Sequence, residues 1–61
     1  MDDLVILTPA QVAERIPTIT ALTLQNWRAA RKGPPFHYIG RNVVYYWNEV
    51  QDWLKSLETY I

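Results

Sequence analysis

Four prolines and two glycines divide this chain of 61 residues into short segments. A helix that starts near Pro9 must end before Pro17, because the residue ahead of a proline avoids the helical region. A later helix must end at the run Gly33-Pro34-Pro35, since proline cannot continue a helix. Sixty-one residues form at most one domain. We therefore expect short elements packed into a single domain over residues 1–61, with its core at about 6–58.

A short helix is predicted immediately after Leu7. Thr8 is a good N-cap, Pro9 suits the first helical position and Gln11 completes a capping box. Leu7 and Val12 occupy the two positions of a hydrophobic staple, so both should face the core.

A second helix is predicted from an N-cap at Thr20 to about Ala30, with Gly33 as the left-handed residue that terminates it. Leu24 and Trp27 share one face, which should be buried. The opposite face carries no acid, so it could lie against a polyanion. That face holds Leu22, Gln25, Asn26 and Ala29, with Ala21 and Arg28 at its margin.

Residues 36–46, FHYIGRNVVYY, predict two strands around a turn. The turn falls at Gly40, Arg41 and Asn42, where Gly and Asn best adopt a positive φ. If Val43 and Tyr45 face the core, alternation directs Val44 and Tyr46 outward. We therefore take that outward pair as a candidate self-association surface, because exposed apolar pairs often mark protein contacts.

A third helix is predicted with Asn48 as its N-cap and Gln51 completing a capping box. Glu49 and Asp52 should lie in its first turn, as the helix dipole favours. Its apolar stripe is Val50, Trp53, Leu54 and Leu57, and we expect Trp53 to be a core residue.

The charges are segregated along the chain, although six Lys and Arg balance six Asp and Glu. No acid lies between Arg15 and Asn48, and this interval has a local charge of +5. The acids gather near the two ends of the sequence. The cations of the interval are Arg15, Arg28, Arg31, Lys32 and Arg41. This pattern predicts one cationic surface for an anionic partner.

The sequence argues against a metal site, a cofactor, an enzymatic activity and membrane association. The chain has no cysteine and a single histidine, His37, so we expect no metal site and no cofactor. It has no catalytic constellation, so we expect no catalytic residue and no enzyme. We expect no membrane association and a location in the cytoplasm, because no apolar run approaches the length needed to span a bilayer.

The successive fragments LTPAQVAE, TL..WR, GPPF, IGR and EVQDWL resemble the small MerR-like winged helix-turn-helix proteins of the excisionase and AlpA group. The similarity covers about residues 6–54. It implies a mainly α fold with a small β-hairpin, in the order helix, helix, hairpin wing, helix. Two departures stand out. The family usually reads Gly-Val-Ser between the first two helices, where PTIT here is one residue longer. Gln25, Asn26, Val44 and Tyr46 also replace family arginines, which implies weaker phosphate attraction.

The resemblance implies that different elements contact different parts of double-stranded DNA. The second helix would enter the major groove, where Gln and Asn side chains bind adenine and small apolar groups contact thymine methyls. Arg31 and Lys32 would bind phosphates, and Arg41 and Asn42 would form the wing in the minor groove. The recognition-helix residues are Thr20, Ala21, Leu22, Gln25, Asn26 and Arg28.

The resemblance also implies a function. Many members are phage recombination directionality factors, or excisionases, which bind attachment-site DNA and bend it to favour excision by an integrase. Copies would bind cooperatively, head to tail, as a short filament on DNA in the bacterial cytoplasm. A small transcriptional regulator of phage or prophage origin remains an alternative. A protein-interaction adaptor that does not bind DNA is an alternative from another class.

Overall fold

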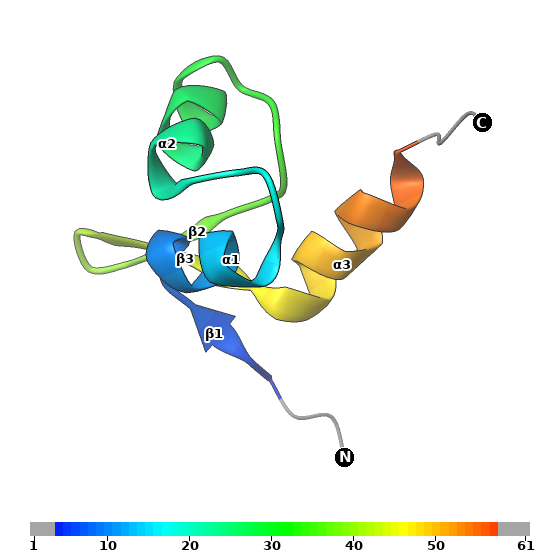
Figure 1. Cartoon of the computed structure of the whole chain (residues 1–61). Coiled ribbons are helices and arrows are strands. Elements are labelled where there is room, and N and C mark those ends of the chain that lie inside the picture. The colour runs from blue at the N-terminus through cyan, green and yellow to red at the C-terminus, as the bar shows by residue number, and fades with distance from the viewer. Residues whose placement is uncertain (1–3, 58–61) are drawn as a thin grey trace.

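The computed structural model describes residues 4–57, which contain three short helices and a three-stranded antiparallel sheet (Figure 1). The fold is therefore mixed, with one strand more than the hairpin predicted from the sequence. The elements in chain order are β1 (Ile6–Leu7), α1 (Pro9–Arg15), α2 (Ala21–Ala29), β2 (His37–Ile39), β3 (Asn42–Tyr46) and α3 (Trp47–Ser56).

The predicted start of α1 is confirmed. The Thr8 hydroxyl accepts a hydrogen bond from the Gln11 backbone N–H at 3.1 Å, and the Gln11 side chain accepts from the Thr8 N–H at 2.9 Å. Pro9 occupies the first turn, and Leu7 and Val12 are both buried in the core. The helix ends at Arg15, two residues before Pro17.

The connection to α2 contains a backbone outlier. Thr18 has φ = +76°, a region that a β-branched residue adopts only under constraint. The chain turns here so that α1 can pack against α2. Thr20 then caps α2 as predicted, with its hydroxyl accepting from the Thr23 N–H at 3.1 Å.

The sheet has the order β1-β3-β2. Strand β1 pairs Ile6 with Tyr46 and Leu7 with Tyr45, a pairing that the sequence did not predict. The β2–β3 hairpin is confirmed, with Ile39 paired to Asn42.

The hairpin turn is shorter than predicted, because its central residues are Gly40 and Arg41 alone. Gly40 has φ = +63°, and a positive φ at the first central residue is what a type II′ hairpin turn requires. Asn42 does not adopt a positive φ. It is instead the first residue of β3.

The predicted start of α3 is wrong by two residues, because the N-cap is Tyr46 and not Asn48. Strand β3 runs directly into the helix, so Tyr46 is its N-cap and no side chain caps it. The Trp47 N–H is satisfied by the Val5 carbonyl at 2.9 Å instead. Asn48 and Gln51 therefore form no capping box. Glu49 is the acid in the first turn, as predicted, whereas Asp52 lies beyond that turn.

The core lies between the sheet and the three helices. Its buried members are Leu7, Val12, Leu24, Tyr45 and Val50. Trp27 packs against this cluster, as predicted. Trp53 does not belong to this cluster and is only partly buried. The centre of its ring lies 5.6 Å from that of Trp27, so the two rings meet between α3 and α2. The expectation that Trp53 is a core residue is therefore wrong.

Candidate nucleic-acid interface

The exposed face of α2 is the one that the sequence predicted. Ala21, Leu22, Gln25, Asn26 and Ala29 are all exposed. Leu22 is 62% exposed. The buried residue of the opposite face is Leu24.

Thr20 is the N-cap of α2, directly before this face. Its hydroxyl caps α2 and also shares a hydrogen bond with the Thr23 hydroxyl at 3.1 Å. The side chain therefore has little hydrogen-bonding capacity left for a base. The structure therefore shows Thr20 as the residue that sets where α2 begins.

Helix α2 ends in a tight loop that displays two cations. The Lys32 N–H bonds the Trp27 carbonyl at 2.8 Å and the Arg31 N–H bonds the Arg28 carbonyl at 3.1 Å, the pattern of a Schellman motif. Arg31 takes the left-handed position with φ = +58°. The prediction that Gly33 is the terminating residue is therefore wrong, although Gly33 also has a positive φ.

Gly33 is required for a different reason. A Cβ atom on this residue would lie 2.8 Å from Cε3 and 3.0 Å from Cβ of Trp27. The backbone of Gly33 therefore lies directly against the indole, and Pro34, which follows it, is buried. The loop thus folds over Trp27 and leaves Arg31 and Lys32 exposed.

Arg28 is anchored rather than free. Its Nη1 donates a hydrogen bond of 2.7 Å to the hydroxyl of Tyr45 on β3. Its guanidinium also lies 5.8 Å from the centre of the Phe36 ring and 6.0 Å from that of Tyr45, within the range of cation–π attraction. No local pattern in the sequence predicts this contact, because it joins residues 17 positions apart.

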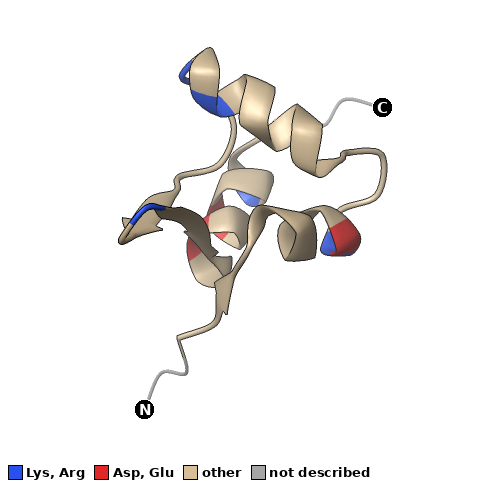
Figure 2. Ribbon diagram, turned by 90° about the vertical axis from the view of Figure 1, so that its left-hand side faces the viewer, with Lys and Arg blue, Asp and Glu red and all other residues tan. Residues whose placement is uncertain are grey.

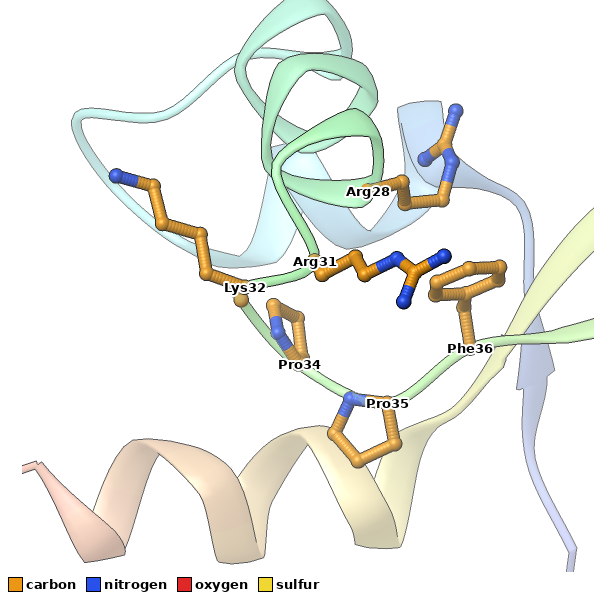
Figure 3. Close-up of a pocket in the computed structure, with 7 residues that line it drawn as sticks. Arg28, Arg31, Lys32, Pro34, Pro35 and Phe36 are labelled. Atoms are coloured by element: carbon orange, nitrogen blue, oxygen red, sulfur yellow. The ribbon is translucent and has the colours of Figure 1, made fainter.

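An open hollow of about 440 Å³ lies at the end of α2. It is lined by Arg28, Arg31, Lys32, Gly33, Pro34, Pro35 and Phe36. In Figure 3 the side chains of Arg28 and Arg31 extend on the side of Phe36, whereas Lys32 points the other way. No acid lines the hollow, so its charge is positive.

A further cation marks the tip of the hairpin. Arg41 and Asn42 are exposed, and no atom lies within 4 Å of where a Gly40 side chain would begin. Figure 2 shows the Lys and Arg positions of the α2 end and of the hairpin on the same side of the molecule. The structure therefore brings Arg28, Arg31, Lys32 and Arg41 to one side.

Arg15 does not join this group. It lies at the end of α1 and stacks on Trp47, with its guanidinium 5.0 Å from the ring centre. The expectation that all cations of the acid-free interval share one surface is correct for four of the five. Within residues 4–57 none of the five forms an ion pair with a carboxylate.

Glu49 is hydrogen-bonded to His37. Oε1 of Glu49 lies 2.7 Å from Nε2 of His37. The His37 ring stacks on the Tyr46 ring, with 4.0 Å between the ring centres. The contact joins β2 to the first turn of α3.

The candidate self-association pair is not an exposed surface. Val44 is only 7% exposed and Tyr46 is partly buried beside His37. Exposed apolar side chains lie instead on the two outer strands of the sheet and just before β1: Leu4, Val5, Ile6, Tyr38 and Ile39.

Residues 4–57 hold no group of three metal-ligating side chains, and none of their helices is long and apolar enough to cross a bilayer. The chain matches no family model, and no curated protein or solved structure is significantly similar to it.

Proposed function

We propose that this protein binds double-stranded DNA as a small winged helix-turn-helix protein. In this proposal α2 is the recognition helix in the major groove, α1 is the helix that supports it, and the β2–β3 hairpin is the wing in the minor groove. One observation carries the proposal. The exposed, acid-free face of α2 leads into a group of three cations, and a fourth cation lies at the hairpin tip on the same side.

The exposed side chains of α2 suit base edges. Gln25 and Asn26 present amides that bind adenine through N6 and N7, and Leu22 presents an apolar surface for a thymine methyl. Arg28, Arg31 and Lys32 carry the charge that attracts phosphates. Such contacts fix the register of the protein without reading sequence.

Within this class, we propose an excisionase, or recombination directionality factor, of phage origin that acts in the bacterial cytoplasm. It would bind attachment-site DNA, bend it, and assist an integrase without performing chemistry. Support for this step comes from the ordered sequence fragments that resemble the excisionase and AlpA group. The same resemblance suits a small transcriptional regulator equally well.

The proposal includes contacts between copies on neighbouring sites. The exposed apolar residues beside β1 and on β2 lie at the two edges of one sheet. Because the edges differ, a contact between β1 of one copy and β2 of the next is head-to-tail, and it gives an open filament when the rotation between copies does not close a ring. The proposed surface therefore moves from Val44 and Tyr46 to the sheet edges.

The same exposed apolar side chains favour an adaptor that binds protein rather than DNA. Salt dependence separates the two. Four phosphate contacts give a log–log slope of affinity against salt of about −3.6, and an adaptor has no measurable affinity for duplex at low salt. Footprinting on phage attachment-site DNA, followed by an excision assay with the cognate integrase, separates the excisionase from the regulator.

A further inference from the structure

Tyr45 has a polar end in an apolar core. Tyr45 is fully buried, with 0% exposure. The centre of its ring lies 6.4 Å from the centre of the Phe36 ring. Every buried side-chain nitrogen or oxygen in residues 4–57 has a hydrogen-bond partner, and for the Tyr45 hydroxyl that partner is Arg28 Nη1. A phenylalanine would fill the same space, so packing alone does not explain the hydroxyl.

Arg28 is held at a boundary between core and solvent. A guanidinium has five N–H donors, and the Tyr45 hydroxyl accepts from one of them. Cation–π attraction to Phe36, whose ring centre lies 5.8 Å from the guanidinium carbon, favours the same position. Since no carboxylate of residues 4–57 pairs with Arg28, its charge is fixed in place but not neutralised.

The surroundings of Arg28 suit a phosphate. The hollow beside it is open, is lined by Arg31 and Lys32, and contains no acid. Arg31 is itself displayed by a left-handed backbone that a non-glycine residue rarely adopts. Arg28 and Arg31 both line the hollow, and Figure 3 shows their side chains on the side of the α2 end where Phe36 lies, with the Arg31 guanidinium beside the Phe36 ring.

We propose that Tyr45 is a positioning residue, whose buried hydroxyl holds Arg28 in the orientation that receives a DNA phosphate in this hollow. The inference rests on the proposed DNA-binding function and adds a core residue to its site. An arginine that is ordered before binding loses less conformational freedom when the phosphate arrives. Tyr45 therefore raises affinity without touching DNA.

Tyr45→Phe tests the proposal, measured on a duplex with one binding site at fixed salt. Release of one side chain should weaken binding about two- to tenfold. The salt slope should stay unchanged, because Arg28 still contacts its phosphate. Tyr46→Phe is the matched control, because the neighbouring hydroxyl makes no hydrogen bond to residues 4–57 while its ring stacks on His37. It should bind as the wild type does.

A double-mutant cycle separates positioning from general weakening. Arg28→Ala should flatten the salt slope by about one unit. Adding Tyr45→Phe to Arg28→Ala should then cost no further affinity, because nothing remains to be positioned. Full additivity of the two losses would overturn the proposal.

A direct measurement on the wild type tests the proposal even if Tyr45→Phe fails to fold. The ¹⁵N–¹H signals of the Arg28 side chain should be those of an immobilised guanidinium in the free protein and should shift when duplex is added. A freely rotating Arg28, or one indifferent to DNA, overturns the positioning role while DNA binding itself stands. If the wild type binds no duplex at low salt, both proposals fail.

Discussion

The indole of Trp27 lies directly against the backbone of Gly33, so that a Cβ on Gly33 would stand 2.8 Å from Trp27 Cε3. This contact joins the last turn of α2 to the loop that follows it. It fixes the segment that displays Arg31 and Lys32, and it makes the glycine irreplaceable at φ = +89°.

Gly33→Ala should therefore destabilise the domain by about 2–4 kcal/mol, from the positive φ together with the clash. Urea denaturation followed by tryptophan fluorescence measures this loss. Gly40→Ala is the matched control, because Gly40 has φ = +63° but open space around it. It should lose only about 1–2 kcal/mol. Equal losses for the two variants would show that Trp27 does not confine Gly33.

Thr18→Gly should stabilise the domain. Thr18 has φ = +76°, a strain of about 1–3 kcal/mol for such a residue. Glycine removes the strain but costs about 0.5–1 kcal/mol in chain entropy. The expected net gain is about 1 kcal/mol, seen as a higher midpoint in urea. Thr18→Ala keeps a Cβ and should gain much less. A midpoint below that of the wild type would place the strain elsewhere.

Arg31→Gly should change stability and DNA affinity in opposite directions. Glycine suits the left-handed position at φ = +58°, so the variant should be about 0.5–1 kcal/mol more stable. Loss of the guanidinium should weaken binding to all sequences alike and flatten the salt slope by about one unit. Thermal melts and salt titrations measure the two effects. Unchanged affinity would remove Arg31 from the interface.

Gln25→Ala should leave stability almost unchanged, because Gln25 is exposed on α2. It should lose about 1–3 kcal/mol of discrimination at one base step if the side chain binds adenine bidentately. Competition binding with duplexes that vary one step at a time measures this loss. A sequence preference identical to that of the wild type would mean that Gln25 reads no base.

Neighbouring copies should contact each other through unlike edges of the sheet. Ile6→Thr on β1 and Ile39→Thr on β2 remove exposed apolar groups without adding charge. Each variant alone should lose cooperative binding to a two-site duplex, whereas an equal mixture should regain part of it through the intact edge of each partner. Independent filling of the two sites by the wild type would refute self-association on DNA.

Signals between near neighbours in the chain were sufficient for much of the fold. The capping box at Thr8, the N-cap at Thr20, the stop at Pro17 and the hairpin at Gly40 were all predicted correctly. Each depends on residues within three or four positions of one another, and in these places the tertiary structure agrees with the local preference. For the same reason the exposed face of α2 followed from the helical period alone.

What the sequence did not determine involves residues far apart. Pairing with β1 ends β3 at Tyr46 and starts α3 at Trp47, which overrides the cap signal of Asn48. Packing buries Val44, which the alternation pattern placed outward, and leaves Trp53 outside the core.

The candidate site shows the same division. The sequence by itself placed the polar face of α2 and the cations at the helix end and the hairpin tip, because these follow from period and turn chemistry. Only the tertiary structure separated Arg15 from that group and joined Arg28 to Tyr45. The approach of two side chains 17 positions apart depends on how the elements pack, and no local pattern encodes that packing.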